Sequence, residues 1–287
     1  TRWGLPGVVR RFCRVSSGGL GAYTSAYLLV EHGVSPWVGM AAGMVVAAAV
    51  AMVIGYFSFR YDLKGAYFAL ATFAFAEMLR LVTTSSDAVN GAVGYQVPLI
   101  QGSSMWQMQF PAGSPAYFWI ALVLAGGAVA LSILFRHSPA GRYVVAIRDD
   151  ELAAASVGAP VMRHKLLTVA LSGAITAVAG AFYTQYYLFI DPQLAFGSSV
   201  SIEAIVTAVI GGIGTIWGPV VGAVIVGSLS DVTATLLATP PEFLSFLQGR
   251  SGLDVILYAV MLILIVRLMP KGIFGTLADK ISERRRR

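Results

Sequence analysis

The sequence predicts an all-α fold, a polytopic bundle of transmembrane helices with an amphipathic helix on its cytoplasmic side. Composition is the first reason, because 57% of the 287 residues are hydrophobic and only 12% are charged, against roughly 25% charged in soluble domains. The second is a series of apolar runs close to the roughly 20 residues that cross a bilayer as a helix. The third is the gathering of Lys and Arg in alternate loops between those runs.

We expect about eight apolar segments, two of them short. The six longer segments are 37–59, 65–82, 117–135, 166–190, 216–237 and 253–269. The two short segments, 19–30 and 201–213, hold too few residues to cross a bilayer as straight helices. We interpret them as half-helices, re-entrant segments or helices buried in protein.

The distribution of basic residues predicts that both chain ends lie in the cytoplasm. Basic residues gather in segments 1–18, 60–64 and 136–165 and again after Arg267, whereas the other side holds little beyond Arg80 and Arg250. Because Lys and Arg favour the cytoplasmic side, this alternation fits an even number of crossings. The net charge of +6 therefore reflects topology and does not favour nucleic-acid binding.

Three parts follow from these patterns. They are a basic cytoplasmic N-terminal segment (1–18), a transmembrane domain (19–269) and a basic cytoplasmic tail (270–287). The sequence starts with Thr1 and shows no signal peptide of the usual form. We expect an N-terminus that is truncated or altered.

The polar residues give no support to an enzyme or a metal site. Cys13 is the single cysteine, which excludes an intramolecular disulfide framework and a Cys-rich metal site. His32, His137 and His164 are scattered without metal-ligand spacing. We find no nucleophile–base set and no pair of catalytic carboxylates, so we expect no enzymatic activity and no cofactor in this chain.

The loop 136–165 is the one sizeable polar stretch between two spans on the predicted inner face. We expect a short amphipathic helix that begins with Ser138 as cap and Pro139 in the first turn and ends at Gly158 and Pro160. Its predicted apolar face carries Val144, Ile147, Leu152 and Ala155, and its predicted charged face carries Arg148, Asp149, Asp150 and Glu151. Such a helix lies across a membrane surface and offers one face to a partner. The alternative is an ordinary surface loop.

Within this loop, Ala153, Ala154 and Gly158, with acidic Glu151 just before them, resemble the EAA-type loop of ABC importer permeases. More specifically, segments 61–82, 138–183 and 201–227 are similar to the LivM-type permease of branched-chain amino-acid importers. The resemblance extends from about residue 18 to the end of the chain.

The resemblance implies a bacterial inner-membrane permease that forms half of a translocation pathway and hydrolyses no ATP itself. It implies four partners: cytoplasmic ABC ATPase subunits, a second permease of the LivH type, an extracellular or periplasmic amino-acid-binding protein, and the lipid bilayer. It also implies that the amphipathic helix couples the permease to the ATPase. The residues expected to do so are Arg148, Asp149, Glu151, Ala153, Ala154 and Gly158.

The sequence departs from the family pattern at two places. Leu152 stands between Glu151 and the two alanines, and the lead into residue 21 is basic where the family has an apolar, Gly-rich segment after further spans. Three alternatives stay open: an ABC permease for a related polar solute such as urea or amides, an ATPase-independent secondary transporter or channel, and a membrane-embedded enzyme.

Charged residues inside apolar segments are the candidates for the translocation pathway. Glu77 and Arg80 lie three apart on one face of segment 65–82, where they can neutralise each other. A charge at membrane depth usually faces a pathway or a partner, although Arg80 lies near the end of the span and the pair also fits a structural role. Glu203 begins the short segment 201–213, where it fits a helix N-terminus or the pathway.

A glycine-rich run follows Glu203. Gly211, Gly212 and Gly214 lead to Gly218 and Gly222, and this spacing favours close helix packing and a helix break. The run lacks the Lys and Ser or Thr of a phosphate-binding loop. The functional interpretation is that broken helices at this point shape the pathway, as in other transporters.

Overall fold

The computed structural model describes residues 5–61, 63, 66–99, 105–111, 114–212 and 217–238. The predicted apolar segment 253–269 and the predicted tail 270–287 lie outside the described residues. The chain divides into two compact units, Thr1–Ile202 and Glu203–Arg287. Each unit is described by itself.

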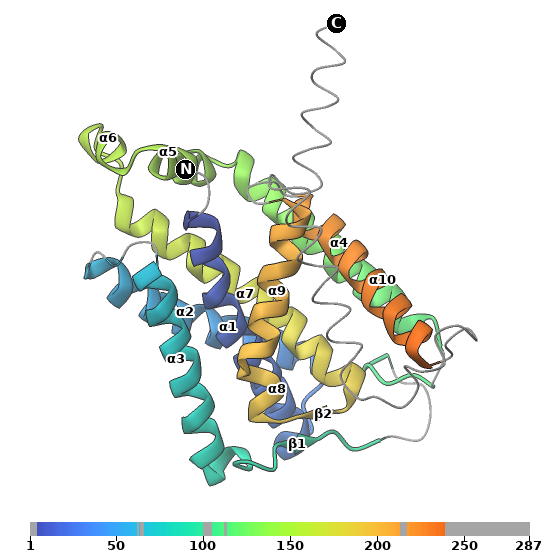
Figure 1. The fold of residues 1–287 in the computed structure, drawn as a ribbon. Coiled ribbons are helices and arrows are strands. Elements are labelled where there is room, and N and C mark those ends of the chain that lie inside the picture. Colours follow the sequence, from blue (N-terminus) through green and yellow to red (C-terminus); the bar gives the residue numbers. More distant parts are fainter. Residues whose placement is uncertain are drawn as a thin grey trace, which may run out of the picture. The chain divides into compact units, whose positions relative to one another are not determined.

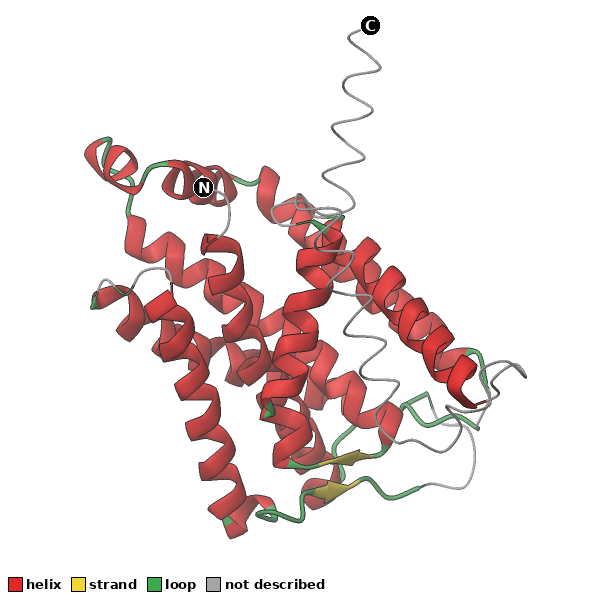
Figure 2. Cartoon of the chain, viewed as in Figure 1, coloured by secondary structure: helices red, strands yellow, loops and turns green. Residues whose placement is uncertain are grey.

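Helices make up most of the described chain, as predicted (Figure 2). In order, the elements are α1 (Leu5–His32), α2 (Pro36–Arg60), α3 (Ala66–Ser85), η1 (Asp87–Val89), β1 (Tyr95–Gln96), α4 (Ala116–His137), α5 (Pro139–Asp149), α6 (Glu151–Ser156), α7 (Val161–Tyr187), β2 (Phe189–Ile190), α8 (Pro192–Phe196), α9 (Ser198–Gly211) and α10 (Gly218–Ala238). The first unit contains the elements from α1 to α8 and the first residues of α9. The second unit contains the rest of α9 and the whole of α10. Figure 1 labels these elements.

Three of the described helices, α2, α4 and α7, are long and apolar enough to cross a membrane. They coincide with the predicted segments 37–59, 117–135 and 166–190. The structure therefore confirms an apolar helical protein with several candidate spans. The full set of eight segments stays a prediction.

The first helix is longer than its sequence pattern predicted. The apolar segment 19–30 was expected to be too short to cross, but α1 is one helix of 28 residues. At 1.5 Å rise per residue, its length is about 42 Å. A search for apolar runs stops at the first charges, whereas Arg has a high helix propensity and the helix continues through the basic residues.

Helices α1, α2 and α7 form the core of the first unit through small residues. A stripe at four-residue spacing along α2 is buried: Gly39, Gly43, Ala47, Ala51 and Gly55. A side-chain carbon added to Gly21 of α1 would lie 2.5 Å from the Cα of Ala177 in α7, and one added to Gly43 would lie 3.1 Å from the Cα of Gly21. The backbones therefore approach almost to contact, which is the packing that small residues permit between membrane helices.

One end of the first unit is closed by a short sheet and an aromatic cluster. Strands β1 and β2 pair antiparallel, with Tyr95 opposite Ile190, so the long loop after α3 is tied to the segment after α7. Tyr23 stacks on Phe196 of α8 at 5.9 Å between ring centroids and meets Tyr95 edge-on at 6.2 Å. Helices α5 and α6 lie at the opposite end of the unit (Figure 1).

Candidate functional site

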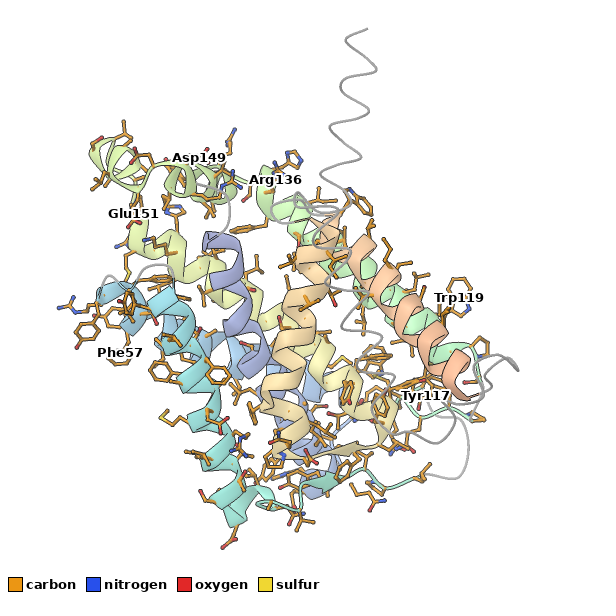
Figure 3. All side chains as sticks on the ribbon, viewed as in Figure 1. Phe57, Tyr117, Trp119, Arg136, Asp149 and Glu151 are labelled. Atoms are coloured by element: carbon orange, nitrogen blue, oxygen red, sulfur yellow. The ribbon has the colours of Figure 1, made fainter. Side chains whose placement is uncertain are left out.

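The predicted coupling loop forms helices α5 and α6, which join α4 to α7. Figure 3 shows Asp149 and Glu151 on this segment and Arg136 where α4 ends. Ser138 caps α5, because its Oγ accepts a hydrogen bond of 3.1 Å from the N–H of Gly141, and Pro139 occupies the first turn. Both features were predicted.

The expected single amphipathic helix is two helices, because the chain breaks at Asp150. Asp150 is extended, with φ −152° and ψ 113°. Its carboxylate Oδ1 accepts hydrogen bonds of 3.0 Å from the N–H groups of Leu152 and Ala153. Asp is a strong N-cap residue, so it ends α5 and starts α6. The prediction of one continuous helix is therefore wrong.

The break also changes which side chains face outward. Ile147 is buried at 8% exposure, as an apolar-face residue should be. Leu152, predicted for the same face, is 83% exposed, and Val157 is 85% exposed. Extended backbone at Asp150 resets the rotation of the chain, so helical periodicity does not continue from α5 into α6. Leu152 and Val157 therefore form an exposed apolar pair, which periodicity across the break could not identify.

The predicted charged residues divide into two groups. Arg148 and Asp149 pair with each other at 3.2 Å, and both side chains are exposed. Glu151 instead pairs with Lys165 near the start of α7, with 2.6 Å between Oε1 and Nζ. The structure thus leaves Arg148 and Asp149 at the surface and ties Glu151 to the helix bundle.

The predicted small residues also play different parts. Ala153 is exposed, whereas Ala154 is buried. Gly158 has φ +80°, and a side-chain carbon there would meet nothing within 4 Å. A backbone in this left-handed region favours glycine, so Gly158 is required for the turn after α6 and not for close packing inside the unit.

The predicted pair of Glu77 and Arg80 is present in α3. Oε1 of Glu77 accepts hydrogen bonds from Nη2 and Nε of Arg80 at 2.6 and 3.0 Å. The Arg80 side chain is 24% exposed and that of Glu77 is 40% exposed. The spacing of three residues brings them together on one face, which lowers the cost of placing either charge in an apolar setting.

Glu203 and the glycine run belong to the second unit. Helix α9 begins at Ser198, and its first turn contains no acidic residue. Glu203 lies further along the helix, so the interpretation of Glu203 as a residue at the helix N-terminus is wrong. Gly211 ends α9, and Gly212 follows with φ +123°. A side-chain carbon on Gly222 of α10 would lie 3.0 Å from the backbone nitrogen of Gly211.

This close approach agrees with the predicted packing and helix break. Gly214 lies outside the described residues. Glu77 and Arg80 belong to the first unit and the glycine run to the second. In the part of the chain that the structure describes, no group of three or more His, Cys, Asp or Glu residues is placed to hold a metal ion.

Comparison with protein families gives a match over most of the chain. A family described as "Branched-chain amino acid transport system / permease component" matches residues 14–266. No solved structure gave a significant match.

Three curated relatives illustrate the range of similar proteins. The permease protein LivH of the high-affinity branched-chain amino acid transport system of Escherichia coli K12 is 34% identical over 160 residues, which cover 56% of this chain and 47% of LivH. The LivM permease protein of that strain is 26% identical over 228 residues, covering 72% of this chain and 53% of LivM. The L-arabinose ABC transporter permease protein AraH of Azospirillum brasilense is 29% identical over 245 residues, covering 84% and 67%. The chain spans about half the length of the LivH and LivM relatives.

Proposed function

Because this chain belongs to the family of branched-chain amino acid transport system permease components, we propose that it forms half of the membrane pathway of an ATP-binding-cassette importer for branched-chain amino acids. The family match over residues 14–266 is the observation that supports this most. Both LivH and LivM, which are similar to the chain, are named as permeases of high-affinity branched-chain amino acid transport.

The segment formed by α5 and α6 is the proposed docking surface for a cytoplasmic ATPase. Its exposed side chains include charged Arg148 and Asp149, near the end of α5, and apolar Leu152 and Val157, in and directly after α6. An exposed apolar centre with charged neighbours suits a protein interface. The proposed coupling residues are Arg148, Asp149, Glu151, Ala153, Ala154 and Gly158. The exposure of Leu152 and Val157 adds these two residues to the set.

For the solute pathway we propose the charged pair of α3 and the glycine break of the second unit. A charge in an apolar helix is costly unless it faces a pathway or a partner, and broken helices shape the binding sites of many transporters. The residues are Glu77, Arg80, Glu203, Gly211, Gly212 and Gly214.

The remaining parts of the importer are proposals of the same kind. They are a LivH-type permease as the second half of the pore, ATPase subunits in the cytoplasm and a periplasmic amino-acid-binding protein. We place the chain in a bacterial inner membrane as a multi-pass protein with both termini in the cytoplasm. The ends of α2 and α4 and the start of α7 carry basic residues, which favours that orientation.

Reconstitution tests the proposal. The chain is co-expressed with candidate ATPases, a LivH-type permease and a binding protein, and [³H]leucine uptake into proteoliposomes is measured with and without ATP. We expect ATP-dependent uptake. Leu152→Asp puts a charge into the proposed interface, so the co-purified ATPase should fall at least about tenfold.

Arg163→Met is the matched control for this experiment. Arg163 is an exposed residue of α7 and makes no ion pair with any residue that the structure describes. ATPase binding should stay at the wild-type level in this variant. Uptake of leucine without any ATPase, or normal ATPase binding by Leu152→Asp, would contradict the proposal.

A sugar permease is the second candidate. The arabinose relative matches a larger share of this chain than LivH or LivM does. The same proteoliposomes therefore receive L-arabinose in a parallel arm, with a sugar-binding protein in place of the amino-acid-binding protein. ATP-dependent uptake of arabinose and not of leucine would replace the amino acid as the solute and leave the role of permease unchanged.

A further inference from the structure

Lys165 connects α6 to the helix bundle. It lies in the second turn of α7, and its Nζ is 2.6 Å from the carboxylate Oε1 of Glu151, the first residue of α6. The Lys165 side chain is 24% exposed. Partial burial protects this ion pair from screening by salt better than full exposure would.

The same ammonium group also contacts α2. Nζ of Lys165 lies over the ring of Phe59, 5.3 Å from its centroid, which is within the range of a cation–π interaction. The Phe59 ring stacks on Phe68, in the first turn of α3, at 5.4 Å between centroids. Phe68 is buried and packs with Ala51, Ile54 and Val169. Lys165 of α7 therefore contacts α6 through Glu151 and α2 through Phe59, and the Phe59 ring in turn contacts α3.

Helix α6 is bounded by non-helical backbone at both ends. It has six residues, with extended backbone at Asp150 before it and the positive φ of Gly158 after it. Hinges are commonly a few residues at the ends of an element, so these two positions are where a rotation of α6 as a unit would be absorbed. Glu151 stands at its start, where the ion pair with Lys165 would pass such a rotation to the bundle.

We propose that Lys165 is the positioning residue that transmits movement of α6 to α2, α3 and α7 during transport. The inference rests on the proposed function, because it names how the same docking segment acts on the membrane helices. An ATPase that displaces α6 pulls on Lys165 through Glu151. Lys165 in turn moves Phe59 and the buried residues packed around Phe68. Without this side chain, ATP hydrolysis and helix movement become separate events.

The test measures ATP hydrolysed per leucine taken up by the complete reconstituted importer. Lys165→Met keeps the apolar stem but removes the charge, so ATPase binding and hydrolysis persist while uptake falls, and the ratio rises about fivefold. Lys165→Arg retains both the ion pair and the contact with the aromatic ring and should stay within about twofold of wild type. Arg163→Met, two residues away on the same helix, should leave the ratio unchanged.

Two further variants separate the contacts of Lys165. Glu151→Gln removes the ion pair, and Phe59→Leu removes the aromatic partner. Each should raise the ratio, and adding Glu151→Gln to Lys165→Met should raise it no further, since residues that act through one contact are non-additive. If Lys165→Met does not reach the membrane, these two variants decide the question.

The measurements distinguish failure of the role of Lys165 from failure of the proposed function. A wild-type ratio in Lys165→Met, or in both Glu151→Gln and Phe59→Leu, overturns the role of Lys165 while the importer remains. If the wild-type chain itself binds no ATPase or takes up leucine without ATP, the proposed function fails first.

Discussion

Individual glycines set how closely the helices of the first unit approach. A side-chain carbon on Gly180 of α7 would meet the carbonyl group of Gly18 in α1, with its carbon at 2.7 Å. Gly126 of α4 is also in a helix, but an added carbon there would meet nothing within 4 Å. The same residue type therefore has a packing role at one position and none, inside the described protein, at the other.

This contrast gives a prediction for a pair of equal substitutions. Gly180→Ala should destabilise the detergent-purified protein by about 1–3 kcal/mol, because the added methyl group overpacks the contact with α1. Gly126→Ala should be neutral or stabilise by up to about 1 kcal/mol, because Ala favours helix more than Gly does. Thermal denaturation of both variants measures the difference, and equal melting temperatures would contradict the packing described for α1 and α7.

Residue spacing predicts one of the ion pairs of the candidate site but not another. Glu77 and Arg80 are three apart, so one helix face suffices to predict their ion pair. Glu151 and Lys165 are fourteen apart and separated by a turn. Their contact depends on the direction that Gly158 gives to the chain, which spacing does not encode.

Among the elements, α6 depends most on a single side chain. A helix of six residues is too short to be stable alone, and the carboxylate of Asp150 binds two of its free N–H groups. The cap therefore holds both α6 and the position of Glu151 at its start.

Loss of the cap should loosen α6 without unfolding the bundle. Asp150→Ala should cost the helix about 1 kcal/mol, which corresponds to about fivefold faster amide exchange at residues 152–156. Asp150→Asn keeps an acceptor oxygen and serves as the control. Hydrogen exchange with mass spectrometry measures both variants, and equal exchange in Asp150→Ala and wild type would show that the cap does not hold α6.

The long apolar helices could be predicted because hydropathy alone defines them. Segments 37–59, 117–135 and 166–190 correspond to α2, α4 and α7. Two other features could not be predicted from hydropathy. The N-terminal extent of α1 depends on helix propensity through charged residues, and the break between α5 and α6 depends on one capping side chain. Both effects are of the order of 1 kcal/mol per residue, too small to stand out in a hydrophobic pattern.

For the molecule as a whole, the two ends of the first unit differ in chemistry. One end holds the β1–β2 sheet and the aromatic cluster. The other holds the end of α2, the start of α7 and the segment formed by α5 and α6, where Lys165 of α7 contacts both α2 and α6. If basic residues mark the cytoplasmic side, the two ends face opposite sides of the membrane.

Cysteine labelling tests this orientation. In a Cys13→Ser background, which removes the single native cysteine, Asp149→Cys should react with a membrane-impermeant maleimide in inside-out vesicles. Gln96→Cys, at the exposed position of β1, should react in spheroplasts instead. Labelling of both positions from the same side would contradict the predicted topology.

The small-residue stripe of α2 has a consequence for how the sequence can vary. Both α2 and α4 are apolar enough to cross a membrane, yet α2 has nine buried residues and α4 has none. Exchanges among Leu, Val, Ile and Phe should leave folding unaffected over much of α4, whereas Gly43 and Ala47 of α2 can be replaced only by the smallest side chains. In a saturation library of both helices, side-chain volume should therefore limit the tolerated residues along the buried stripe of α2. In α4 the main requirement should be that the side chain is hydrophobic, although the two helices have similar hydropathy.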